Sequence, residues 1–396
     1  MVTRRSFLAA AGAAALAAPL GRGLLGGPAS AAAATCALTL ANHGSSPVNA
    51  YITGREQGTD KPMLLRADGT PYHLESPSGP QTPLPVDCSI PVGAGGEANL
   101  TLSQMYAARI YFVKNDKLDF YVNPGPALVE PAFANTSDAN YGRTWSFCEF
   151  TFNPSQLFAN ISYVDLLTAL PIGLELVGDA THTVAPAPAG AVGAVADALV
   201  AQKNADGAPW DRLVIRNGDG VLRVIAPQDL MASDSAAFSS YWDGYVGQVW
   251  DKYATTDLRV DLQGGRGVLT GRVKGGVLTF NDGSTFARPA SKDIFTCNDG
   301  PFANNPADSD IKKGLLARIA AAFNRSTILS SADQPNGTPE SGFYQAPTTN
   351  HWARIVHAHT PIGYAFPYDD VCPDGQPDVS GAASDGNPRH LTVSVG

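Results

Sequence analysis

Two carboxylates lie in an apolar, aromatic stretch of the chain, FCEFTFNPSQLFANISYVDLL (residues 147–167). Glu149 stands among phenylalanines, and Asp165 follows Ile-Ser-Tyr-Val. Acidic residues normally lie in solvated positions, because removing an ionised carboxylate from water costs free energy. The stretch therefore predicts either a site at which the carboxylates do chemistry or a structural use, in which they bond to turns or pair with cations.

Strand alternation places Glu149 on a polar face. If CEFTFN is a strand, Glu149, Thr151 and Asn153 share one face, and Cys148, Phe150 and Phe152 share the other. A second strand is expected over residues 160–164, with Ile161, Tyr163 and Asp165 on one side, and residues 154–159 are enough to return the chain. The two acids could thus face each other across a groove between neighbouring strands.

Opposed carboxylates of this kind suit glycoside hydrolysis. One must be protonated to supply the leaving oxygen, and the other must be ionised to activate water or to attack the anomeric carbon. An apolar wall raises a carboxyl pKa, which suits an acid catalyst. Glu149, near Phe147 and Phe150, is the better candidate for the acid, and Asp165 is then the base.

The same stretch resembles a known family. EFTFNPSQLFANISYVDLLTALPIGLEL (residues 149–176) resembles the acidic-cleft segment of thaumatin-like proteins, and YAFPYDDV (residues 364–371) resembles their Y-A-Y-D-D segment. Over nearly all of the chain beyond the N-terminal segment, the sequence is identified as a member of glycoside hydrolase family 64, the β-1,3-glucanases built on a thaumatin-like domain. The segments that carry the resemblance are ARIYF, KLDFYVNPGPALVEP, WSFCEFTFN, SQLFANISYVD, PIGLEL, YWDGYVGQVWDKY, NHWARIVHAH and YAFPYDDV.

The resemblance implies an activity and two roles. Glu149 resembles the family's general acid and Asp165 its general base, which implies inversion at the anomeric carbon and release of short laminari-oligosaccharides, typically the pentamer. The alternative is a thaumatin-like protein that binds β-1,3-glucan without cleaving it. The sequence departs from the thaumatin-like pattern at Asn160, where those proteins carry a further acid. The site is therefore closer to a single pair of carboxylates than to an acidic cluster.

Several residues are candidates for holding the glucan. Thr151 and Asn153 are predicted to bond to sugar hydroxyls, with Asn160 beside them, and Phe158 and Tyr163 to offer a stacking surface. Asp369, with Asp370, could bind sugar hydroxyls or a calcium ion, or could equally be a structural part of a turn. The tryptophans that could form platforms are Trp145, Trp242, Trp250 and Trp352, of which Trp242 and Trp250 fit better in the core.

No metal or cofactor is expected. His351, His357 and His359 invite a metal hypothesis, since His-Ala-His on a strand would put two imidazoles on one face. No acidic or cysteine motif accompanies them, so packing or groove lining is the preferred interpretation.

The order of patterns predicts a mainly β protein with an α/β insertion. Strand patterns such as CALTLAN and VNAYITG fill residues 35–176, and ARIYFVKND with KLDFYVN suggests a hairpin. We predict a thaumatin-like β-sandwich or barrel over 35–176, completed by a return to strand and turn over 346–396. A mixed α/β domain over 177–345 should flank a wide groove, with helices near 189–205, 236–254 and 308–326. PGPALVEPAFANTSDANYG (residues 124–142) is a long connection and a candidate binding loop.

The first residues predict export. Arg4-Arg5 followed by Ser-Phe-Leu and an alanine-rich run resembles a twin-arginine signal peptide covering residues 1–31, too short and interrupted to span a bilayer. Removing it takes away three arginines (Arg4, Arg5, Arg22) and no acid, so the net charge of −9 becomes −12. This balance disfavours nucleic acid and anionic membranes as partners and is compatible with a neutral glucan. We expect a secreted monomer.

Five cysteines remain after residue 31, an odd number for an oxidising compartment. Two disulfides and one free thiol are expected among Cys36, Cys88, Cys148, Cys297 and Cys372, with the pairing left open.

Overall fold

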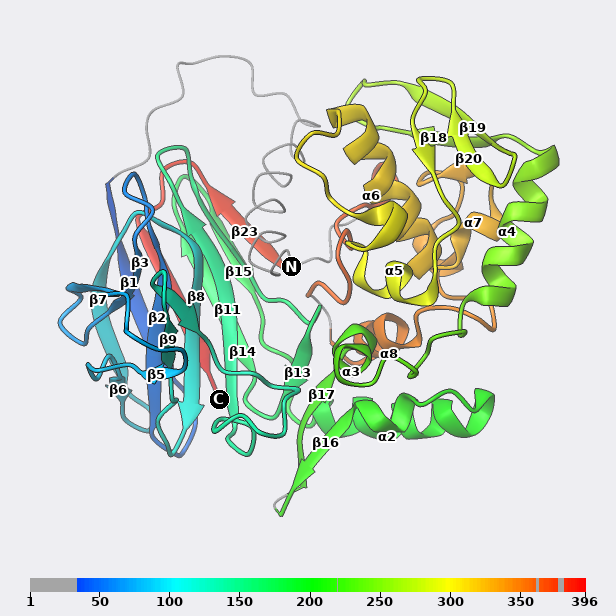
Figure 1. Cartoon of the computed structure of the whole chain (residues 1–396). Coiled ribbons are helices and arrows are strands. Elements are labelled where there is room, and N and C mark those ends of the chain that lie inside the picture. Colours follow the sequence, from blue (N-terminus) through cyan, green and yellow to red (C-terminus); the bar gives the residue numbers. More distant parts are fainter. Residues whose placement is uncertain (1–33, 219, 361–362, 377–380) are drawn as a thin grey trace.

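The computed structural model describes residues 34–396 except 219, 361–362 and 377–380. The predicted signal peptide (1–31) lies outside the described residues. A β-rich part holds the first half of the chain and the C-terminus, and a second part carries most of the helices (Figure 1).

Two sheets make up most of the β-rich part. A five-stranded sheet has the order β15-β14-β24-β1-β7, and a larger sheet has the order β23-β12-β11-β8-β2-β3-β4, with β6 also on β2. A small sheet, β10-β9-β5, lies beside them. The strands are β1 (Thr35–Asn42), β2 (Val48–Glu56), β3 (Pro62–Leu65), β4 (Pro71–His73), β5 (Thr82–Pro83), β6 (Ile90–Val92), β7 (Glu97–Ser103), β8 (Met105–Lys114), β9 (Tyr121–Asn123), β10 (Ala127–Val129), β11 (Trp145–Phe152), β12 (Leu157–Asn160), β14 (Ile172–Val177), β15 (Thr181–Val184), β23 (Ala382–Asp385) and β24 (His390–Val395).

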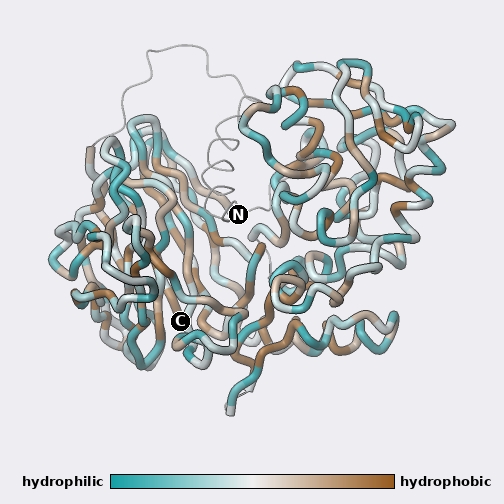
Figure 2. Tube along the Cα trace, in the orientation of Figure 1, coloured by the Kyte–Doolittle hydropathy of each residue, from teal (hydrophilic) through white to brown (hydrophobic). Residues whose placement is uncertain are grey.

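The last strands of the chain enter both large sheets. β23 pairs with β12, and β24 lies between β1, to which it is parallel, and β14. Buried side chains from both sheets belong to one apolar core. Along the tube, hydrophobic stretches of the strands alternate with hydrophilic loops (Figure 2). In β1, Cys36, Leu38 and Leu40 enter this core in the predicted alternation, whereas β2 is buried on both faces over residues 50–54.

The second part is mixed. Its sheet has the order β21-β20-β19-β18-β22. Its helices and remaining strands are α2 (Ala191–Asp206), α3 (Pro227–Ser233), α4 (Asp243–Thr255), α5 (Ser291–Thr296), α6 (Asp310–Asn324), α7 (Thr327–Ser330), α8 (His351–His359), β18 (Leu258–Asp261), β19 (Val268–Lys274), β20 (Val277–Phe280), β21 (Thr285–Phe286) and β22 (Asp333–Gln334). The three helices predicted from periodicity correspond to α2, the second half of the 236–254 segment (α4) and α6, which Ser309 caps by accepting from the Lys312 N–H.

A second three-stranded sheet links the two parts. β13 (Leu166–Thr168) directly follows Asp165 and pairs with β17 (Gly220–Ile225), which pairs with β16 (Val214–Asn217). The chain therefore leaves the large sheet at Asn160 and enters this linking sheet at Leu166. Asp165 lies at the entrance to it.

A strand and a hairpin predicted outside the site do not form. HWARIVHAH forms helix α8, not a strand, because Trp352, Ile355 and Val356 bury one helical face and the Asn350 side chain caps its first turn. The hairpin predicted from ARIYFVKND and KLDFYVN does not form: β8 pairs with β2 and β11, whereas β9 pairs with β10 and β5.

The disulfide prediction is also wrong. None of the five cysteines, all within the described part of the chain, forms a disulfide. Four of them are buried, and burial raises the pKa of the Cys36 and Cys88 thiols to about 11. The fold therefore relies on core burial. In the described ranges, no helix is both long and apolar enough to cross a membrane.

Candidate active site

A row of polar side chains crosses the large sheet. In the strand registers, Thr53 of β2 lies opposite Arg109 of β8, Arg109 opposite Glu149 of β11, and Glu149 opposite Asn160 of β12. Directly opposed residues of antiparallel strands point to the same face of a sheet. Glu149 therefore lies between a cation on one neighbouring strand and an amide on the other.

An aromatic row runs beside this polar row. Two residues further along each strand, Tyr51 lies opposite Tyr111, and Tyr111 lies opposite Phe147. The rings of Tyr111 and Phe147 are 5.5 Å apart, and the Arg109 guanidinium lies 4.5 Å from the centre of the Phe147 ring. This cation–π contact fixes the arginine against an apolar wall next to Glu149.

A β-bulge in β8 shapes the strand beside the polar row. Pairing steps from Ala108 to Met105 on β8 while β11 advances from Phe150 to Phe152, so β8 carries an extra residue. Ala107, within this bulge, has a φ of 47°. Bulges increase local twist and often aim side chains at functional sites. This one lies two residues from Arg109.

Arg109 holds Glu149 through one oxygen. Its Nε and Nη2 lie 3.0 and 2.9 Å from Oε1 of Glu149, whose side chain is 11% exposed. Burial raises the pKa of Glu149, the Arg109 charge opposes that rise, and the charges of Asp165 and Glu130 add to it; the net pKa is raised. Glu149 is thus placed to carry a proton at a pH where an ordinary glutamate has lost it, and Oε2 is the oxygen that can carry it.

Asp165 is brought to the same site from a different element than expected. The strand predicted over 160–164 is wrong, since β12 ends at Asn160. The next residues turn away, with Tyr163 donating its N–H to the Tyr364 carbonyl at 2.6 Å. The Asp165 carbonyl accepts from the Ala226 N–H at 2.8 Å, which fixes the half-buried residue at the start of α3. Its charge still acts on Glu149, so the structure brings the two predicted acids into one electrostatic unit.

Three of the predicted glucan ligands, Thr151, Phe158 and Asn160, lie on this face. Thr151 and Phe158 are opposite each other on β11 and β12, and both are partly exposed. With Glu149 and Asn160 they form a patch two residues by two. Asn153 lies at the turn after β11, where its Oδ1 accepts from the N–H groups of Ser155 and Gln156 at 2.8 and 3.0 Å, so it organises the turn.

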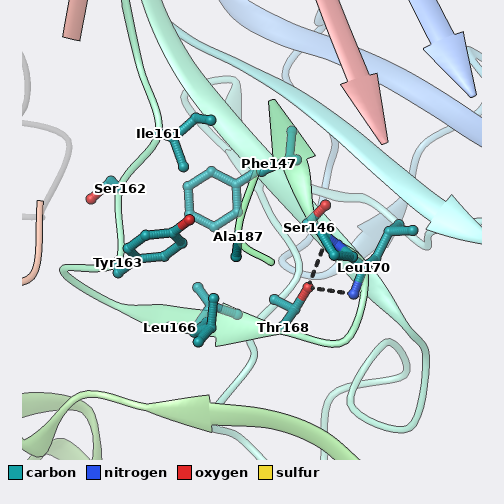
Figure 3. Close-up of a pocket in the computed structure, with 12 residues that line it drawn as sticks. Ser146, Phe147, Ile161, Ser162, Tyr163, Leu166, Thr168, Leu170 and Ala187 are labelled. Carbon is teal, nitrogen blue, oxygen red and sulfur yellow. Dashed lines mark hydrogen bonds between the residues drawn. The ribbon is translucent and has the colours of Figure 1, made fainter. Parts of the chain in front are cut away.

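The structure does not support Tyr163 as a stacking surface. Its side chain is 4% exposed, and a Cβ on Gly363, at φ +138°, would lie 2.3 Å from its ring. Tyr163 and Phe147 line a cavity of about 20 Å³, room for about one water molecule and far too small for a sugar ring (Figure 3). A larger hollow of about 430 Å³ includes Asp206 and Arg212 in the helical part and none of the predicted site residues.

Asp369 has a structural environment. Its side chain is 1% exposed, and it bonds to Arg325 at 3.0 Å, to His357 at 2.8 Å and to the Ala365 N–H at 2.9 Å. Burial alone would raise the pKa of Asp369, but His357 and Arg325 outweigh it, and the net pKa is lowered. These contacts favour the structural interpretation of Asp369 over direct sugar binding.

Replacing Asp369 with asparagine should therefore reduce the free energy of unfolding by about 3 kcal/mol, because it leaves the Arg325 charge buried without its counter-charge. Urea unfolding of both proteins measures the change. Asp197, exposed on α2, provides the matched control: Asp197→Asn should shift the midpoint little. A loss below about 1 kcal/mol for Asp369→Asn would contradict the structural interpretation.

The other aromatic and histidine candidates are mostly packing residues. Trp145, Trp242, Trp250 and Trp352 are buried, as expected for Trp242 and Trp250. His351 packs on Trp210 at 5.5 Å, and His357 bonds to Asp369. Residues two apart do not share a face of a helix, so His357 and His359 of α8 do not present their two imidazoles together to a metal ion. Within the described ranges no cluster of three or more His, Cys, Asp or Glu side chains could hold a metal ion.

Sequence reasoning missed Arg109 and Glu130. Both lie in segments that carried the family resemblance, ARIYF and KLDFYVNPGPALVEP, and Glu130 lies in the loop proposed for binding. Nothing in the linear pattern told which residue of β8 would oppose Glu149, since that depends on register and on the bulge.

Sequence comparison places the chain in a family. The model of glycoside hydrolase family 64, described as beta-1,3-glucanase, matches residues 34–395. The chain belongs to glycoside hydrolase family 64. It is 31% identical to the glucan endo-1,3-beta-glucosidase of Cellulosimicrobium cellulans and 30% identical to that of Arthrobacter sp. (strain YCWD3), each over 381 residues and 93% of this chain. The chain spans 66% of the length of these two relatives.

Solved structures of the family share the fold. A laminaripentaose-producing beta-1,3-glucanase in complex with laminaritetraose is 31% identical, with a TM-score of 0.79, covering 91% of this chain and 98% of that one. A beta-1,3-glucanase domain from Clostridium beijerinckii is 22% identical, with a TM-score of 0.71, and covers 92% and 99%. The mainly β architecture with few helices is therefore that of family 64.

Proposed function

We propose that this glycoside hydrolase cleaves β-1,3-glucan with inversion and releases short laminari-oligosaccharides such as laminaripentaose. The observation that carries the proposal is the environment of Glu149, a carboxyl group with a raised pKa under the electrostatic influence of Asp165. An acid that keeps its proton beside a second carboxylate is the pair that inverting hydrolysis requires. The relatives of this chain that are named glucanases support the choice of substrate.

The reaction follows from the two roles. Glu149 donates its proton to the glycosidic oxygen as that bond breaks, so the leaving sugar departs neutral. Asp165 removes a proton from a water molecule, which attacks the anomeric carbon from the opposite face. The new C–O bond therefore has the α configuration. Arg109 holds the Glu149 carboxyl group in place throughout, and Thr151 and Phe158 contact the sugar beside it.

The expected product from laminarin is an oligosaccharide born as the α-anomer. Proton NMR during the first minutes of digestion shows which anomer appears before mutarotation mixes the two forms. A β-anomer at that time would contradict inversion and make Asp165 a nucleophile or move the partner of Glu149 elsewhere. If thin-layer chromatography shows no new oligosaccharide from laminarin or curdlan, the alternative of a non-catalytic glucan-binding protein is favoured.

We also propose that the β-rich part is a thaumatin-like domain and that the protein is secreted by the twin-arginine route. The resemblance of residues 149–176 and 364–371 to thaumatin-like segments supports the first proposal. Arg4-Arg5 in the N-terminal segment supports the second.

A further inference from the structure

Glu130 closes the polar row at its Thr53 end. Its Oε2 lies 3.3 Å from Nη1 of Arg109, and its Oε1 accepts a hydrogen bond of 3.0 Å from the hydroxyl of Thr53. Thr53 is fully buried, and the side chains of Arg109 and Glu130 are 15% and 13% exposed. The loop after β10 thus delivers a carboxylate to the guanidinium group that holds Glu149.

The contact between Arg109 and Glu149 has an electrostatic cost for a general acid. A guanidinium group in contact with a carboxylate favours its ionised form, so Arg109 on its own would work against a general acid. Arg109 nevertheless contacts Glu149 by two nitrogens and is fixed on Phe147. The site can keep this geometric anchor only if the charge of the anchor is balanced from elsewhere, and Glu130 lies on the other side of the same guanidinium group.

We propose that Glu130 is a positioning residue that holds and neutralises Arg109, so that Arg109 fixes the Glu149 carboxyl group without removing its ability to carry the catalytic proton. The proposal rests on the proposed function of Glu149 as general acid. The charged and titratable groups around Glu149 are Arg109 of β8, which also bonds to the Tyr111 hydroxyl, Glu130 of the loop, and Asp165 before β13. Of these, Glu130 is in contact with Arg109 and is not assigned to the reaction itself.

Glu130→Gln tests the proposal through the pH dependence of kcat/KM. The variant keeps the shape and removes the charge that balances Arg109, so the pKa of Glu149 should fall and the alkaline limb of kcat/KM should move to lower pH by about one unit. Glu130→Asp keeps the charge and should leave the limb near its wild-type position, even if kcat falls because the shorter side chain reaches Arg109 less well. Glu97→Gln, the same change at an exposed residue of β7, should leave the whole profile unchanged.

A second measurement does not depend on catalysis. The infrared band of the protonated Glu149 carboxyl group, assigned by its loss in Glu149→Gln, can be titrated in wild type and in each folded Glu130 variant. A lower apparent pKa in Glu130→Gln and not in Glu130→Asp supports the proposal. Equal losses of activity in both variants, with the band titrating as in wild type, would overturn it and make Glu130 purely structural.

The two measurements also separate the inference from the proposed function. If wild type does not hydrolyse laminarin but the Glu149 band still shifts in Glu130→Gln, the coupling stands and the proposed function fails. If laminarin is hydrolysed and the band does not shift, the function stands and the inference fails.

Discussion

Replacing Glu149 with glutamine is expected to lower the turnover of laminarin by roughly two to four powers of ten, the usual contribution of a general acid. The amide occupies the same space and can still contact Arg109 through its oxygen, but it carries no proton that it can give to the glycosidic oxygen. Binding of laminari-oligosaccharides should persist, because Thr151 and Phe158, the proposed sugar contacts, are unchanged. Turnover measured by released reducing ends and binding measured by calorimetry test the two halves of this expectation.

The nature of the leaving group makes this test specific for the acid. In a glucan-derived substrate with a dinitrophenyl aglycone, the leaving group departs without protonation. Glu149→Gln should therefore hydrolyse this substrate at a rate much closer to that of wild type. Glu175→Gln, at an exposed residue of β14, is the matched control and should behave as wild type. Near wild-type hydrolysis of laminarin by Glu149→Gln would remove Glu149 from the acid role.

The sequence indicated Glu149 as the candidate acid because its signal is local. An acid in a strand of phenylalanines, alternating with Cys148 and Phe150, predicts one buried face and one polar face. β11 is instead buried on both faces except at Thr151, and Glu149 shares its face with Trp145 and Phe147. The apolar neighbours alone predicted a raised pKa for Glu149, and burial does raise it. Local pattern, however, does not contain strand order, and strand order is what places Arg109 beside Glu149.

The predictions that failed depended on which strands pair, or on a choice between the strand period and the helix period. β8 was expected to turn back on β9, but it lies in the middle of the large sheet, and its partners β2 and β11 come from distant parts of the chain. HWARIVHAH was expected to be a strand, whereas the spacing of Trp352, Ile355 and Val356 is helical. The cap at Asn350 was the further signal that could have decided it.

The sequence placed Asp165, the candidate base, on the wrong element. The strand expected over 160–164 ends at Asn160, so the two acids do not face each other across neighbouring strands. Instead the chain crosses to the linking sheet, and the backbone around Asp165 is fixed by the start of α3, where Ala226 donates to the Asp165 carbonyl and the Gln228 side chain bonds to the Val164 carbonyl. The helical part thus helps to position one of the two carboxylates, which the sequence pattern did not indicate.

Replacing Asp165 with asparagine is expected to reduce laminarin turnover by roughly two to four powers of ten, since the amide cannot accept a proton from the attacking water. The substrate with a dinitrophenyl leaving group should not restore this variant, because its missing step is the activation of water and not the protonation of the leaving oxygen. The dinitrophenyl substrate therefore distinguishes the two variants. Its good leaving group restores turnover in Glu149→Gln and does not restore it in Asp165→Asn.

The control for Asp165→Asn is Asp197→Asn, the same change at an exposed residue of α2, which should leave turnover unchanged. The pH profile gives an independent measurement, because the alkaline limb set by Glu149 should remain in Asp165→Asn. Removal of the Asp165 charge also takes away one of the influences that raise the pKa of Glu149, so the remaining alkaline limb should move to lower pH. If Asp165→Asn is instead rescued by the good leaving group, the two carboxylates have been assigned in the wrong order.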